Sequence, residues 1–341
     1  MAVLEVDNLT MEYRSEQGPV RAAEDVSFSV DHNDVMGLVG ESGSGKTTVA
    51  KCINRTLADN GEIQGGEIRF KGEDLLTLSE REMRDIRWNE ISMIPQTAMN
   101  ALNPVYTVAD QFAEVITHHQ DKSKAEAIER GKELFELVDL DPNRIDNYPH
   151  QFSGGMLQRV MIAMSLALDP SVILADEPTT ALDVIVQDAI LNRIEALQDE
   201  LDFSILLITH DISVVSEMCD DIAVMYGGRV VETGRTRDII KEPLHPYTMG
   251  LRNAFPSIET DAESLISIPG TPPALIDPED ECRFAHRCPF AEDGCYEGVP
   301  AARTYEHDHR VECVRSDEAE FLREESRSHT VWEDLRETIT Q

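Results

Sequence analysis

At residues 40–47 the chain reads Gly40-Glu41-Ser42-Gly43-Ser44-Gly45-Lys46-Thr47. Residues 35–39 before it are apolar and predict a buried strand, and residues 47–57 after it have the apolar spacing of a helix. A glycine-rich loop in this context can turn its N–H groups around phosphate oxygens, at the positive end of the helix dipole. Lys46 would reach the β- and γ-phosphates and Thr47 would hold Mg²⁺. The sequence therefore predicts a site for a nucleoside triphosphate.

A second motif follows further along the chain, where the apolar run 172–175 ends in Asp176 and Glu177. Asp176 can hold Mg²⁺ through water, and Glu177 can polarise an attacking water as a general base. An acidic strand end is also ordinary in a chain with this many carboxylates. Its pairing with the phosphate-binding loop favours the catalytic interpretation.

A third motif, Phe152-Ser153-Gly154-Gly155, precedes a helix predicted at 155–168. A Ser-Gly-Gly turn at a helix N-terminus is an anion site, but by itself it can simply be a helix cap. One nucleotide does not need two such sites in one chain. The economical interpretation is that this one completes the nucleotide pocket of a partner subunit.

The remaining pattern predicts an α/β protein. Strands are expected at 3–9, 26–30, 65–70, 204–209 and 222–226, and helices at 79–87, 108–118 and 124–138, the first opened by a capping box of Ser79 and Glu82. We expect a nucleotide-binding core at 1–242 with an inserted α-helical subdomain at about 97–168. Beyond it, 243–341 is rich in proline and contains four cysteines, which predicts a small loop-rich appendage, with short helices at 318–327 and 331–339.

The charge is strongly negative. There are 65 Asp and Glu against 30 Lys and Arg, giving a net charge of −35, and only seven of the cations are lysines. Such a charge opposes binding to a phosphate backbone, so no nucleic acid partner is expected. Acidic excess with few lysines and 6% aromatic residues indicates a halophilic protein of a high-salt cytosol, although an ordinary acidic bacterial protein remains an alternative.

No stretch of the sequence is long enough to cross a bilayer. The longest near-apolar stretch, 160–168, is far shorter than the roughly 20 residues that a membrane span needs. The first ten residues lack the pattern of a secretory signal. We therefore expect a cytosolic chain that reaches a membrane only through partners.

Taken in order, these motifs resemble those of the ATP-binding subunits of ABC transporters, over roughly residues 3–240. Residues 40–47 are similar to Walker A, 172–177 to Walker B and 152–156 to the signature motif; 181–183 resemble the D-loop. The resemblance implies catalytic roles for Glu177, for Gln96 in the Q-loop, which also touches Mg²⁺, and for the switch histidine His210. It implies ATP contacts for Tyr13, Gly40, Ser42, Gly43, Ser44, Gly45, Lys46, Thr47, Thr48, Asp176, Ser153, Gly154, Gly155 and Asp183.

Further features are similar to the oligopeptide and dipeptide importer branch of that family. Met156 stands where many members have Gln, and the segments at 100–104, 245–248 and 268–273 match the branch. The resemblance implies an ATPase on the cytoplasmic face of the cell membrane that powers uptake of di- or oligopeptides. Its partners would be a homologous second ATPase subunit in a heterodimer, two transmembrane permease subunits and, indirectly, an extracellular substrate-binding protein.

Other functions remain open at this stage. Nickel or another small solute could be the cargo, because importers of these belong to the same branch. A soluble ABC ATPase for nucleic-acid processing would need basic arms or two cassettes, and the chain has one cassette. An ATPase for iron–sulfur assembly would not account for 100–104 and 245–248.

Four cysteines fall within 32 residues, with the spacing Cys282-x5-Cys288-x6-Cys295-x17-Cys313. Four thiolates suit either an iron–sulfur cluster or a tetrahedral Zn²⁺ site, and a disulfide or unmetallated segment is a further alternative. The spacing lacks the Cys-x2-Cys knuckle of zinc ribbons, and members of the resembled branch can carry a [4Fe–4S] cluster here. His286, His307 and His309 are candidate substitute ligands, but we expect them to be solvated, and we expect Cys52 and Cys219 to be buried as small apolar residues.

Overall fold

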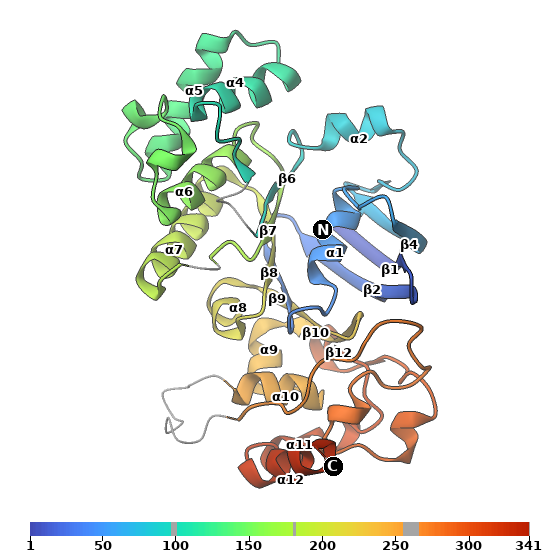
Figure 1. The fold of residues 1–341 in the computed structure, drawn as a ribbon. Helices are drawn as coiled ribbons and strands as arrows, with labels where there is room; N and C mark the ends of the chain where they lie inside the picture. Colours follow the sequence, from blue (N-terminus) through green and yellow to red (C-terminus); the bar gives the residue numbers. More distant parts are fainter. Residues whose placement is uncertain (97–100, 180–181, 255–265, 341) are drawn as a thin grey trace. The chain divides into compact units, whose positions relative to one another are not determined.

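The computed structural model describes residues 1–96, 101–179, 182–254 and 266–340 (Figure 1). The chain forms two compact units. The first comprises Met1–Leu4, Val30–Val35 and Phe70–Ile208, and the second comprises Glu5–Ser29, Met36–Arg69 and Thr209–Gln341. Each unit is therefore built from three separate stretches of the chain.

Parallel strands form the centre of the first unit. β7 (Val172–Asp176) pairs with β6 (Ile91–Ile94) on one side and with β8 (Ser204–Thr209) on the other. All residues of β7 and β8 are buried, as expected for parallel strands covered on both faces. The strand predicted at 204–209 is confirmed with its bounds, and the one at 172–175 extends one residue further, to Asp176.

Helices make up most of the rest of this unit. They are α2 (Glu80–Ile86), α4 (Val108–His119), α5 (Lys124–Leu137), α6 (Gly154–Ser165) and α7 (Val184–Leu201), with single 3-10 turns η1 (Pro142–Arg144) and η2 (Pro149–Gln151). The capping box at Ser79 and Glu82 is confirmed. Phe135 joins the predicted helical region into one core, because its ring lies edge-on to both Phe112 and Phe152.

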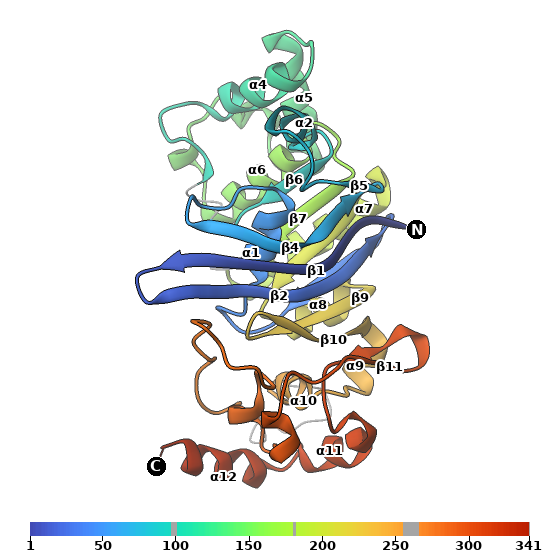
Figure 2. The ribbon, with the colours of Figure 1, turned by 90° about the vertical axis from the view of Figure 1, so that its right-hand side faces the viewer.

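The second unit contains two groups of strands. β1 (Ala2–Ser15) lies between β2 (Gly18–Asp31) and β4 (Gly61–Phe70) (Figure 2). β3 (Val35–Val39), which the sequence predicts with the same bounds, runs parallel to β9 (Asp221–Tyr226). β9 turns at Gly227 and Gly228, both with positive φ, into the antiparallel β10 (Arg229–Arg235).

The C-terminal stretch, residues 243–341, adds two short strands to this second group. β12 (Arg310–Val311) pairs with β10, and β11 (Arg303–Thr304) pairs with β12. The other elements of the second unit are α1 (Lys46–Ile53), α8 (Ile212–Met218), α9 (Thr236–Lys241), α10 (Pro246–Asn253), α11 (Ala319–Glu325) and α12 (His329–Thr340), with 3-10 turns η4 (Ala285–Arg287), η5 (Asp293–Tyr296), η6 (Glu306–Asp308) and η7 (Ser316–Glu318). The short β5 (Glu73–Asp74) belongs to the first unit.

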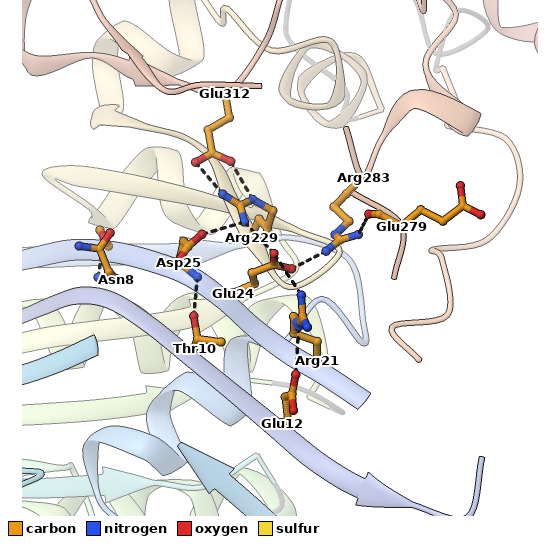
Figure 3. Close-up of polar contacts among 11 residues, drawn as sticks. Asn8, Thr10, Glu12, Arg21, Glu24, Asp25, Arg229, Glu279, Arg283 and Glu312 are labelled. Atoms are coloured by element: carbon orange, nitrogen blue, oxygen red, sulfur yellow. Dashed lines mark hydrogen bonds and ion pairs between the residues drawn. The ribbon is translucent and has the colours of Figure 1, made fainter. Parts of the chain in front are cut away.

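Charged side chains fix the C-terminal stretch onto β2 and β10 (Figure 3). Arg229, which begins β10, donates to Glu312 from Nε at 3.0 Å and from Nη2 at 3.4 Å, and both side chains are buried. Arg283 pairs with Glu24 of β2. The predicted appendage thus contacts the strands of the second unit through buried ion pairs. It also has a small apolar cluster of its own, which contains Leu244, Met249, Val311, Cys313, Ala319 and Leu322.

Candidate functional site

The phosphate-binding loop connects β3 to α1 as predicted. Gly45 caps α1 with φ of 104°, and a Cβ there would lie 2.0 Å from the carbonyl oxygen of Ala22. A Cβ at Gly40 would lie equally close to the carbonyl oxygen of Met225. Both positions therefore exclude any side chain, whereas Gly43, with φ of 82°, faces open space. The glycines thus allow an open loop on a tightly packed base.

Lys46 is folded over this loop. Its Nζ donates to the carbonyl oxygens of Gly40 at 2.7 Å and Glu41 at 2.8 Å, and lies 3.4 Å from Oγ of Ser44. The buried ammonium is thus held where β- and γ-phosphates would lie in a loop of this type. Thr47 and Thr48 follow in the first turn of α1, and Ser42 is exposed in the loop. The hydroxyl of Tyr13, on β1, lies 3.5 Å from Oγ1 of Thr48, which places its ring beside the loop helix.

In the first unit, the structure brings Gln96 and Glu177 together. Nε2 of Gln96 donates a 2.8 Å hydrogen bond to Oε2 of Glu177. Glu177 has a left-handed backbone with φ of 46°, and its N–H donates to the carbonyl of Ile208 at 2.8 Å. Asp176, the last residue of β7, is 1% exposed. This strained turn after a buried strand is typical of a functional site.

The Ser-Gly-Gly turn caps α6. Oγ of Ser153 accepts the N–H of Met156 at 3.4 Å, and α6 begins at Gly154. A Cβ at Gly155 would lie 2.8 Å from Val186 of α7, so this glycine lets the two helix starts approach closely. Asp183 caps α7 in turn, accepting the N–H of Val186 at 3.0 Å. Two helix N-termini therefore open beside each other in the first unit.

The remaining predicted residues are placed as follows. His210 directly follows β8 and is exposed. Of the motif at 100–104, Asn100 lies outside the described residues, as does Ala181 of the segment at 181–183. Within the described ranges, no helix is long and apolar enough to cross a membrane.

Two family models match the chain. One described as ABC transporter covers residues 23–180, and one described as oligopeptide/dipeptide transporter, C-terminal region, covers 231–295. The chain is 45% identical over 320 residues to a probable peptide ABC transporter ATP-binding protein of Sinorhizobium fredii. The matched region covers 93% of this chain and 96% of the relative. It is 40% identical over 323 residues to a dipeptide transport ATP-binding protein of Caldanaerobacter subterraneus, spanning 94% and 99%. It is 43% identical over 300 residues to an oligopeptide transport ATP-binding protein of Salmonella typhimurium, spanning 87% and 90%.

The chain belongs to the ATP-binding subunits of peptide ABC transporters. A solved dimeric ATP-binding cassette in a post-hydrolysis state, bound to ADP and phosphate, matches with a TM-score of 0.62 and 27% identity, over 69% of this chain and 99% of that one. The predicted α/β P-loop core is therefore confirmed, and this ABC subunit is an ATPase.

The four clustered cysteines of the ABC subunit line one small cavity. Cys282, Cys288, Cys295 and Cys313 surround it together with apolar side chains, among them Phe284 and Phe290. All six cysteines of the chain are free thiols in this structure. Burial raises the pKa of Cys282 to about 11 and that of Cys313 to about 12. Within the described ranges, no three His, Cys, Asp or Glu side chains are placed to hold one metal ion.

The predictions for the other cysteines and the histidines had mixed outcomes. Cys52 and Cys219 are buried, and burial raises the pKa of Cys52 to about 12, as expected for small apolar residues. His286 and His307 are exposed as expected. The expectation for His309 is wrong: it is 7% exposed and its Nε2 lies 2.7 Å from Oε1 of the fully buried Glu232. His309 is buried because it pairs with Glu232, which lies 77 positions away in the sequence.

The sequence analysis missed three residues at the phosphate-binding loop. Glu41 bonds through its carboxylate to Arg287 and through its N–H to the hydroxyl of Tyr247. Both partners lie more than 200 positions away. One signal was available: an acidic side chain inside a loop that binds anionic phosphates requires a nearby cation.

Proposed function

We propose that this chain is the ATPase of an importer that takes up di- or oligopeptides, bound peripherally at the cytoplasmic face of the cell membrane. The observation that carries the proposal is that one chain combines the hydrogen-bonded Gln96–Glu177 pair with a C-terminal region of the oligopeptide/dipeptide transporter type. The named relatives are peptide, dipeptide and oligopeptide transport proteins, and they match along nearly their whole length.

In this proposal the two carboxylates after β7 have different tasks. Glu177 accepts a proton from the attacking water, with Gln96 holding the carboxylate in place and contacting the same water. Lys46 leaves the loop carbonyls and pairs with the β- and γ-phosphates, and His210 contacts the γ-phosphate. Thr47, Gln96 and Asp176, the last through water, would hold Mg²⁺, which neutralises charge that develops on the phosphates.

A second, homologous ATPase subunit would complete the site. Ser153, Gly154, Gly155 and Asp183 lie at the adjacent N-termini of α6 and α7, which suits contact with a nucleotide held by the partner. Val184 and Ile185, directly after Asp183, are 80% and 83% exposed, and such side chains are typical of a surface that a partner covers. These features support a head-to-tail pair that closes on two ATP molecules.

The permease subunits would contact the predicted helical region. An apolar hollow in the first unit is lined by Trp88, Met93, Pro95, Leu102, Val115, Met161 and Met164, among others. Val105 and Tyr106, which follow Leu102 closely in the chain, are 71% and 52% exposed. Pro95, which precedes Gln96, lines this hollow. A movement of a permease segment bound in the hollow could therefore be transmitted to the Gln96–Glu177 pair. The domain division at residue 242 and the helical subdomain at about 97–168 belong to the same proposal.

The cysteine cavity would hold a [4Fe–4S] cluster. Four free thiols around an apolar cavity fit the ligand set of such a cluster. A tetrahedral Zn²⁺ site is the alternative for the same four thiols. The cluster would crosslink a loop-rich segment, which is a structural role.

Reconstitution tests the proposal. The chain, its partner ATPase and two permease subunits would be placed in proteoliposomes with the external binding protein, and uptake of a labelled dipeptide, a labelled pentapeptide and ⁶³Ni²⁺ would be measured. We expect ATP-dependent peptide uptake that Lys46→Ala abolishes. Nickel uptake without peptide uptake would establish the alternative cargo. ATP hydrolysis without uptake of any of the three would overturn the importer assignment.

A further inference from the structure

Arg287 forms an ion pair with a residue of the phosphate-binding loop. Its Nη1 and Nη2 lie 2.8 and 3.1 Å from the two carboxylate oxygens of Glu41. The arginine side chain is 7% exposed and the glutamate 24% exposed. A two-pronged guanidinium–carboxylate contact of this kind fixes orientation as well as distance. The C-terminal stretch therefore holds the second residue of the loop.

The guanidinium is itself held by other groups. Nε donates to the carbonyl oxygen of Pro269 at 2.8 Å, and Nη1 also donates to the hydroxyl of Tyr226 at 3.1 Å. The group lies 5.6 Å from the centre of the Tyr226 ring. The side chain of Arg287 is therefore held in place by contacts other than the one with Glu41.

The main chain of Glu41 is fixed as well. Its N–H donates to the hydroxyl of Tyr247 at 2.9 Å, and its carbonyl oxygen accepts from Lys46 at 2.8 Å. Tyr247, on α10, is fully buried, and its ring centre lies 4.6 Å from that of Tyr226. Three separate atoms or groups of Glu41 are therefore bound, and two of them are bound by side chains from the C-terminal stretch.

We propose that Arg287 and Tyr247 are positioning residues for ATP binding, which hold the phosphate-binding loop in its open shape through Glu41. A glycine-rich loop loses conformational freedom when it binds phosphate, and a loop that is already ordered loses less. Arg287 also neutralises a carboxylate that would otherwise repel the nucleotide phosphates. Removal of this arginine should therefore weaken ATP binding by both routes.

The chain offers a matched control in the same segment. Arg283 lies four residues before Arg287, also between Cys282 and Cys288. It pairs with Glu24 of β2 and with the carbonyl oxygen of Glu279, not with the loop (Figure 3). A variant at Arg283 removes a buried anchor of the C-terminal stretch and leaves the Glu41 contact in place. It separates general anchoring from positioning of the loop.

The test measures the ATP dissociation constant of the full chain by calorimetry, and KM and kcat in the assembled complex. We expect R287Q to raise the dissociation constant and KM about tenfold with a smaller change in kcat, and R287K to recover part of the loss. Y247F should raise both values by a smaller factor. In the double variant E41Q/R287Q, loss of the repelling carboxylate should restore only the part of the affinity that R287Q loses through charge, and the part lost through positioning should remain lost. R283Q should bind ATP as the unchanged chain does.

Several results would overturn the proposal. One is an unchanged dissociation constant in R287Q. Another is an equal loss in R283Q and R287Q, which would assign the effect to anchoring alone. A third is an additive rather than compensating effect in E41Q/R287Q. Melting curves identify any variant that fails to fold, and if R287Q fails, the milder Y247F decides through the same binding measurement.

Discussion

Nε2 of Gln96 donates a 2.8 Å hydrogen bond to Oε2 of Glu177. The two residues follow adjacent parallel strands, β6 and β7, so their side chains meet at one edge of the sheet. The amide fixes the orientation of the carboxylate, and fixed orientation of this kind lowers the cost of reaching a transition state.

Glu177→Gln should abolish turnover and keep ATP binding. The amide is nearly isosteric but cannot accept the proton of the attacking water, so we expect hydrolysis to fall by at least about 10²-fold. The measurement is phosphate release by the assembled complex, with ATP affinity determined in parallel. Glu195→Gln on α7, an exposed position, is the matched control and should hydrolyse ATP at the normal rate. Steady hydrolysis by the Glu177 variant would contradict its role as base.

Local signals in the sequence were sufficient for several elements of the fold. β3 was predicted with its bounds because a short apolar run meets glycine at position 40, and β8 because the apolar run 205–208 stands between Ser204 and Thr209. The cap of α2 followed from Ser79 and Glu82, which lie three positions apart. In each case the interactions that decide the structure lie within a few residues of one another.

Elements decided by distant partners were missed. β10 contains Arg229 and Glu232, which argue against a buried strand until their partners Glu312 and His309 are known. α7 begins with Val184 and Ile185, which are apolar and exposed. The first turn of α7 therefore lacks the polar outer face by which a surface helix is recognised in a sequence. The Glu41–Arg287 pair is 246 positions apart. No periodicity within one segment can show which distant charge will neutralise another.

If the cysteine cavity holds the proposed cluster, Cys288→Ser should remove its iron and destabilise the C-terminal stretch. A serine oxygen is a poorer ligand for iron than a thiolate, and loss of a structural metal group removes folding free energy. We expect anaerobically purified protein to lose most of its iron and sulfide and to melt about 5 °C lower. Cys219→Ala removes a buried thiol elsewhere and should keep the metal content. Equal iron content in the Cys288 variant and the unchanged chain would contradict the ligand assignment.

Glu312→Gln should lower the free energy of unfolding by about 2 kcal/mol, because it leaves the buried Arg229 without its closest counter-charge (Figure 3). Two further carboxylates at 3.3 Å, Glu24 and Asp25, keep the loss below that of an isolated buried pair. Urea denaturation followed by circular dichroism measures the change. Asp25→Asn is the control: this carboxylate is 56% exposed, and we expect at most about 0.5 kcal/mol. Equal losses in both variants would show that burial does not set the strength of the network.

Molar salt should stabilise this protein, because its net charge of −35 makes the folded chain repel itself. The Debye length falls from about 10 Å at 0.1 M to about 3 Å at 1 M, so most of the repulsion is screened by that concentration. We therefore expect the melting temperature to rise steeply between 0.1 and 1 M KCl and to level off above it. Stabilisation by exclusion of ions from the surface would instead continue to grow between 1 and 3 M. A melting temperature that stays flat or falls from 0.1 to 1 M would contradict the halophilic interpretation and leave an ordinary acidic protein, in which local ion pairs such as Arg229–Glu312 outweigh the overall repulsion.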